Sequence, residues 1–115
     1  KNCSLLKKKK IPVICFPRGI KKNYLGFANH VKPNCLSLDY EIDPVWAVTK
    51  LSNYCLQGGL DPKVLFKKED EILREVDKYL NNFKGHPYIF NLGHGLLPET
   101  NPEILGKIVE RVNNF

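Results

Sequence analysis

Four short apolar runs, each followed by a segment with helical periodicity, constrain the fold of this 115-residue chain more than any other feature. The runs predict strands at Ile11–Phe16, Cys35–Asp39, Tyr54–Gln57 and Tyr88–Asn91. A strand–helix–strand alternation implies right-handed crossovers and therefore a parallel sheet. We expect an α/β fold of four parallel strands that lie side by side in sequential order. Four such units are half of a (β/α)8 barrel.

The segments between the strands carry helix-start signals and one apolar stripe each. Asp43-Pro44, Asp61-Pro62 and Asn101-Pro102 each place a capping side chain directly before a proline. The stripes predict the buried helix positions, which are Leu25, Ala28 and Val31, then Trp46, Ala47 and Leu51, then Ile72, Leu73, Val76, Tyr79, Leu80 and Phe83, and finally Ile104, Leu105, Ile108, Val109 and Val112.

The formal charge of +6 is compatible with an anionic small molecule, a nucleic acid or an anionic membrane surface as partner. Much of the excess lies in the lysine run Lys7 to Lys10, which can equally be a solvated face. Because no aromatic residues interleave the lysines, we expect no nucleic-acid partner. No apolar run reaches the ~20 residues of a membrane span, and no signal peptide is recognised, so a cytoplasmic location is expected.

The four cysteines, Cys3, Cys15, Cys35 and Cys55, show no C-x-x-C spacing. The last three lie in predicted strands, where a free thiol behaves as a small hydrophobic group. A reduced protein without a metal site is the simpler interpretation, and a disulfide framework is the alternative.

Polar or unusual residues follow every predicted strand: Arg18, Asp39, Gln57, and Asn91 together with His94. In α/β sheets and barrels the carboxyl ends of the strands form the active site. His94 stands between two glycines, which give up packing to allow a close approach. The sequence therefore predicts that His94 faces a ligand; the alternative is a tight turn whose histidine points into solvent. No G-x-G-x-x-G motif follows the first strand, so a dinucleotide fold is not supported.

Three segments resemble the uroporphyrinogen decarboxylase family. Asn91-Leu92-Gly93-His94-Gly95, with Leu97-Pro98-Glu99-Thr100 and Pro102-Glu103 after it, is similar to the family's C-terminal signature. Leu38-Asp39-Tyr40 resembles its Leu-Asp-Trp segment, and Leu56-Gln57-Gly58-Gly59-Leu60-Asp61-Pro62 resembles its Leu-Gln-Gly-Asn-Leu-Asp-Pro segment. Three positions depart from the pattern: Tyr40 replaces tryptophan, Gly59 replaces asparagine and Arg18 replaces the more frequent lysine.

The resemblance implies that residues 1–115 are one partial domain, the C-terminal segment of a TIM-barrel decarboxylase. Such an enzyme removes the carboxyl groups of the four acetate side chains of uroporphyrinogen and gives coproporphyrinogen. The resemblance also implies a homodimer and no metal or organic cofactor. His94 matches the family histidine that lines the substrate cleft, so it is expected to bind a substrate carboxylate. Arg18, Asp39, Gln57 and Asn91 are possible supporting residues.

The family's other active-site groups have no counterpart in this chain, so we expect the chain alone to be inactive. Two other functions remain open at this point. A related barrel methyltransferase would need thiolate and imidazole ligands around zinc. A basic binding module without catalysis would bind anionic polymers with a steep salt dependence.

Overall fold

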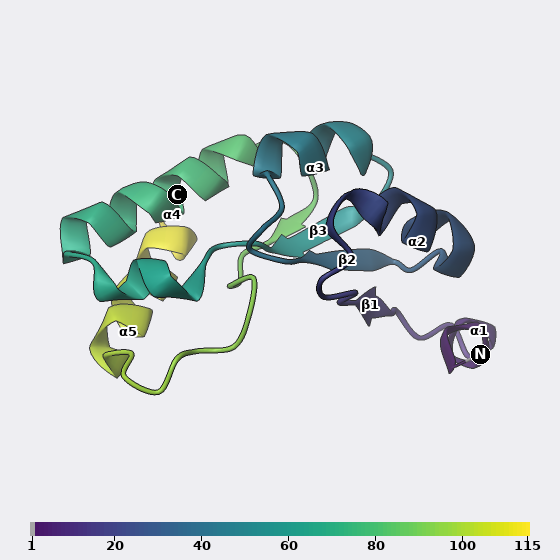
Figure 1. Ribbon diagram of the computed structural model, residues 1–115, viewed down its shortest axis with the longest axis horizontal. Coiled ribbons are helices and arrows are strands. Elements are labelled where there is room, and N and C mark those ends of the chain that lie inside the picture. Colours follow the sequence, from purple (N-terminus) through teal and green to yellow (C-terminus); the bar gives the residue numbers. More distant parts are fainter. Residues whose placement is uncertain (1) are drawn as a thin grey trace.

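The computed structural model describes the backbone of residues 2–115 and the side chains from Ser4 onward. Its four strands are β1 (Ile14–Cys15), β2 (Cys35–Leu38), β3 (Cys55–Gly58) and β4 (Tyr88–Ile89). The α-helices are α1 (Asn2–Lys8), α2 (Tyr24–Val31), α3 (Pro44–Lys50), α4 (Glu69–Asn82) and α5 (Pro102–Asn113). Two 3-10 helices, η1 (Lys21–Asn23) and η2 (Pro62–Phe66), complete the described elements. The molecule is elongated, 44 × 28 × 26 Å, with α1 at one end and α5 at the other (Figure 1).

The strands form one parallel sheet in the order β1-β2-β3-β4, which confirms the predicted topology. Both outer strands are shorter than predicted, with two residues each. An outer strand has one neighbour, and only the part that faces that neighbour can form ladder hydrogen bonds. The apolar runs at Ile11–Phe16 and Tyr88–Asn91 therefore continue beyond the paired residues as irregular chain.

The two faces of the sheet differ because side chains alternate along a strand. Leu36, Leu38 and Leu56 are 0–1% exposed and belong to the core beneath the helices. Figure 1 shows α2, α3 and α4 over that face. On the other face, Gln57 Nε2 donates to Ser37 Oγ at 3.2 Å. The helices thus cover one face, as they do outside a barrel.

Large apolar side chains remain exposed on the two outer strands and beside them. Ile14 on β1 is 50% exposed, Phe16 after it 44%, and Ile89 on β4 45%. In a closed barrel these side chains would meet further strands and an inner layer. The open sheet is what part of a (β/α)8 barrel looks like when the remaining strands are absent.

All three predicted proline-marked starts carry a side-chain cap. Asp43 accepts a hydrogen bond from the Val45 N–H at 3.2 Å, Asp61 from Lys63 N–H at 2.9 Å, and Asn101 from Glu103 N–H at 3.0 Å. Asp61 opens the short η2 helix, while α4 begins separately at Glu69.

Three predictions about the helices were wrong in detail. In α2 the buried positions are Tyr24 and Ala28, whereas Leu25 is 41% exposed. The helix begins at Tyr24 and turns the face with Tyr24 and Ala28 to the core, so Leu25 lies to one side of that face. Val109 of α5 is 57% exposed, since the helix turns Ile104 and Ile108, with Leu105 and Val112 beside them, to the core.

The third concerns Trp46, which was expected to face inward. It packs against the core as expected, but it is only half-buried because it borders an open hollow.

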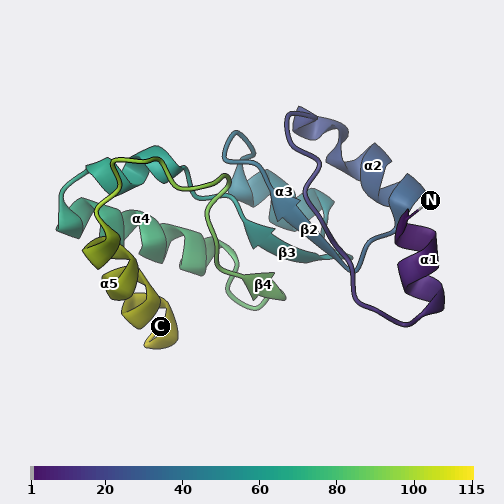
Figure 2. The ribbon, with the colours of Figure 1, turned by 90° about the horizontal axis from the view of Figure 1, so that it is seen from below.

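Helix α1 was not predicted and lies beside α2 (Figure 2). The Lys7 ammonium donates to the Val31 carbonyl at 3.1 Å, which ties the end of α1 to the end of α2. Part of the predicted solvated lysine run is therefore helical. Within residues 2–115, no helix is long and apolar enough to cross a membrane.

Candidate functional site

The carboxyl ends of the strands border a hollow of about 160 Å³ that contains His94. Loops after β1, β2, β3 and β4 all contribute to it. Its lining residues are Arg18, Tyr40, Asp61, Pro62, Lys63, His94 and Leu97. Arg18 and Lys63 outnumber the one carboxylate of the lining, Asp61, so this hollow keeps a net positive charge, which suits a carboxylate ligand.

Gly93 fixes the position of the segment that carries His94. The Gly93 N–H donates to the Leu60 carbonyl at 2.7 Å, and Leu92 forms a parallel bridge with Leu60. A Cβ atom on Gly93 would overlap the Tyr40 backbone, with its Cα only 2.7 Å away. The segment therefore crosses directly over the end of β2, and only glycine permits this approach.

Asp39 holds the β1–α2 loop that carries Arg18. Its carboxylate accepts a hydrogen bond from the Gly19 N–H at 3.0 Å, and the residue is only 5% exposed. The Tyr24 hydroxyl donates to the Ser37 carbonyl at 3.2 Å and accepts from the Asp39 N–H at 2.9 Å. Burial raises the pKa of Tyr24 to about 12, so the hydroxyl stays neutral and keeps both bonds.

Two tyrosines hold the glycine pair at the end of β3. Tyr88 donates its hydroxyl proton to the Gly58 carbonyl, and Tyr79 donates to the Gly59 carbonyl, both at 2.8 Å. Burial raises the pKa of both phenols, that of Tyr79 to about 12. Gly59 has φ +104°, a conformation that a side chain would strain. The departure from asparagine at this position is therefore compatible with the local backbone.

The structure brings together only some of the residues expected at the strand ends. Arg18 and His94 line the same hollow, and Asp39 lies behind Arg18 as an anchor. Gln57 does not line the hollow and bonds to Ser37 instead. Asn91 is exposed and accepts a hydrogen bond from the adjacent Leu92 N–H at 2.8 Å.

Sequence reasoning did not name Tyr40, Lys63 or Leu97 as lining residues. Tyr40 and Lys63 could have been found, because each follows a strand end within a few residues. Leu97 carries no such signal, since its place depends on the path of the chain after β4.

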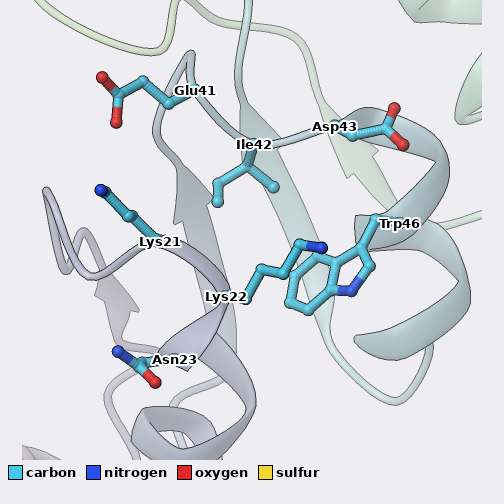
Figure 3. Close-up of a pocket in the computed structure, with 7 residues that line it drawn as sticks. All are labelled: Lys21, Lys22, Asn23, Glu41, Ile42, Asp43 and Trp46. Carbon is cyan, nitrogen blue, oxygen red and sulfur yellow. The ribbon is translucent and has the colours of Figure 1, made fainter.

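A second hollow, of about 610 Å³, lies between the β1–α2 and β2–α3 loops (Figure 3). Its lining residues are Lys21, Lys22, Asn23, Glu41, Ile42, Asp43 and Trp46. Two lysines and two acidic residues face it, so it has no bias towards a polyanion. The hollow at His94, although smaller, is the better candidate for a carboxylate ligand.

Comparison with known proteins identifies the family. The family model for uroporphyrinogen decarboxylase matches residues 1–115, the whole chain. The chain belongs to the uroporphyrinogen decarboxylase family. The resemblance of its three segments to that family is thereby confirmed.

Curated members of the uroporphyrinogen decarboxylase family match most of the chain. The protein of Jannaschia sp. (strain CCS1) is 37% identical over 105 residues, 90% of this chain and 31% of its own length. The protein of Paracoccus denitrificans (strain Pd 1222) is 38% identical over 103 residues, 89% of this chain and 30% of its own. All are named uroporphyrinogen decarboxylase. The chain thus spans about a third of the length of these relatives, in agreement with its open, partial barrel.

Proposed function

We propose that this chain is the C-terminal part, strands five to eight, of a uroporphyrinogen decarboxylase barrel. The complete barrel would remove the carboxyl groups of the four acetate side chains of uroporphyrinogen and release coproporphyrinogen. The observation that carries the proposal is the family match over residues 1–115, combined with the gathering of Arg18 and His94 at one hollow.

The charges at the hollow fit a polycarboxylate substrate. His94 would hydrogen-bond a substrate carboxylate and orient it. Arg18 and Lys63 would supply the positive potential that attracts it, and the guanidinium of Arg18 can hold a carboxylate through two parallel bonds. Asp39 would act through Arg18, because it fixes the loop on which Arg18 stands.

We propose that the reaction uses no metal or organic cofactor. Protonation of a pyrrole ring carbon next to the acetate side chain creates a cation. The bond to the carboxylate then breaks, carbon dioxide leaves, and the electron pair forms an exocyclic methylene group. A proton added to this methylene gives the methyl group, and the ring carbon releases its added proton. Such a reaction needs a proton donor and groups that stabilise the cation. His94 is present for orientation, while the further groups would come from the rest of the barrel. A cytoplasmic homodimer is part of the same proposal.

The alternatives receive less support. A zinc methyltransferase would need a cluster of thiolate and imidazole ligands. Among the side chains of residues 4–115, no three His, Cys, Asp or Glu residues are placed to hold one metal ion. A basic binding module without catalysis is not favoured by the match of residues 1–115 to a family of decarboxylases.

A segment exchange tests the proposal. In a chimera, this chain would replace the matching 104-residue segment of the uroporphyrinogen decarboxylase of Cereibacter sphaeroides (strain KD131 / KCTC 12085), which is 38% identical. We expect the folded chimera to form coproporphyrinogen and the isolated chain to form none. A folded, dimeric chimera without activity, or activity of the isolated chain, would contradict the proposal.

A further inference from the structure

Two cysteines stand opposite one another at the amino ends of the two central strands. Cys35 is the first residue of β2 and Cys55 the first of β3, and they are register partners in the parallel ladder. Neighbouring strands lie about 4.8 Å apart. Because side chains of register partners project to the same side of a sheet, the two thiols lie on one face.

The geometry of a parallel pair is poorly suited to a disulfide. Side chains of register partners project side by side, so their Cβ atoms are separated by about the strand spacing of 4.8 Å. A disulfide prefers Cβ atoms about 3.5–4.5 Å apart. Both cysteines are free thiols in the structure. A direct S–S bond would therefore need the two Cβ atoms to move a few tenths of an ångström closer together.

An ion between the two sulfurs fits this spacing better. A metal–sulfur bond is about 2.3 Å long, so two collinear bonds span roughly 4.6 Å, close to the strand spacing. Thiolates select soft ions such as Cu(I). Because the side chains of residues 4–115 offer no group of three His, Cys, Asp or Glu ligands, a tetrahedral zinc site is not available there.

We propose that Cys35 and Cys55 form a two-coordinate site for a soft monovalent cation of the Cu(I) class. On binding, each S–H bond breaks, each sulfur forms a bond to the ion, and two protons leave to solvent, with no change of oxidation state. The site lies at the amino edge of the sheet, opposite the hollow at His94. It is therefore independent of the decarboxylase proposal.

The Cys35 thiol is buried, with only 4% of the residue exposed. Burial raises the pKa of this thiol to about 12. The thiol is consequently a poor nucleophile at neutral pH, because the thiolate is the reactive form.

The test is an anaerobic titration of the reduced chain with Cu(I) against a chromophoric Cu(I) chelator. A Cys3→Ser background removes the one cysteine whose side chain lies outside the described residues. We expect one Cu(I) per chain, and loss of that binding in Cys35→Ser and in Cys55→Ser. Cys15→Ser is the matched control, since Cys15 pairs with Leu36 and so belongs to the other face of the sheet. That variant should bind Cu(I) like the background chain.

Two further measurements distinguish the loss of a ligand from the loss of the fold. Circular dichroism of each variant shows whether it has folded, and X-ray absorption of the Cu(I)-loaded background chain counts the sulfur ligands without any ligand substitution. Two sulfurs at one short distance support the site. Three or four ligands, equal binding in folded Cys35→Ser, or loss of binding in Cys15→Ser would overturn it, and none of these results bears on decarboxylation.

Discussion

At the scale of single residues, glycines and tyrosines place the functional loops. Gly93 allows the chain to cross the Tyr40 backbone, and this crossing sets His94 above the strand ends. Gly58 is equally constrained, because a Cβ atom there would lie 2.7 Å from the Leu92 carbonyl oxygen. The position of His94 therefore depends on neighbours that have no side chain of their own.

A Gly93→Ala substitution should destabilise the chain by about 1–3 kcal/mol, the usual cost of forcing extra atoms into a packed site. The new methyl group would push the 92–95 segment away from Tyr40. Urea denaturation monitored by circular dichroism measures the change. Gly95→Ala is the matched control, because nothing lies within 4 Å of its added Cβ atom. Equal stabilities of the two variants would show that the crossing is not constrained.

The sequence predicted some of these residues and not others. His94 and Arg18 were recognisable because each follows an apolar strand run at the edge where parallel sheets bind ligands. Gln57 and Asn91 satisfied the same rule, yet one bonds across the sheet and the other to its neighbouring backbone. A strand-end position indicates the edge of the sheet, but the pleat and the loop path decide which way the side chain points.

At the scale of elements, the sheet is held by its helices, and the last two helices are joined by ion pairs. Arg111 of α5 donates to both carboxylate oxygens of Asp77 on α4, at 2.7 and 2.5 Å. Lys107 of α5 pairs with Glu69 of α4. These ion pairs add to the core contacts of Ile104 and Ile108, which hold α5 and with it the end of the long segment between β4 and α5. Element order was predictable from periodicity, whereas α1 was missed because it is short, lysine-rich and dependent on its contact with α2.

The Asp77–Arg111 pair should make stability depend on pH. The hydrogen bond to Arg111 holds the pKa of Asp77 below its usual value. The stabilisation is thus present above the unfolded-state pKa of about 3.9 and is lost as the pH falls through the lower, folded-state pKa. Asp77→Asn should lower the urea midpoint at pH 7, and the difference from the unmodified chain should shrink as the medium is acidified below about pH 3.9.

The control for this prediction is Asp70→Asn, whose partner Arg74 lies on the same helix and is largely exposed. An exposed pair within one helix contributes little to stability, so the midpoint should barely change. If Asp77→Asn leaves the midpoint at pH 7 unchanged, the pair does not join α4 to α5 in solution.

At the scale of the whole molecule, the open edges of the sheet determine whether the chain associates with other copies of itself. Ile14 and Ile89 are 50% and 45% exposed on strands that have no outer neighbour within residues 2–115. Unpaired strand edges with apolar side chains promote association. The chain spans about a third of its curated relatives, and the missing part of the barrel would supply those neighbours.

The isolated chain should therefore self-associate through its edges. Because Ile14 and Ile89 are already about half-buried, each gains only roughly 1 kcal/mol on association, about half of the value for a fully exposed isoleucine. Light scattering over a dilution series should show a mass that rises with concentration, and Ile14→Lys with Ile89→Lys should shift the chain towards monomer. Val109→Lys, on an exposed position of α5, is the control and should leave association unchanged. A monomer that persists at high concentration would contradict the prediction.

The proposal that substrate binds at the strand ends is tested most directly by the role of His94 in the active chimera. Steady-state kinetics with uroporphyrinogen would compare His94→Ala with Asn91→Ala, which lies three residues earlier and outside the hollow. A lost hydrogen bond to a charged group costs about 1.5–3 kcal/mol, so kcat/KM should fall about tenfold or more in His94→Ala. Asn91→Ala should keep the activity of the unmodified chimera. Equal activity of the folded His94→Ala chimera would contradict the assignment of the substrate site to the strand ends.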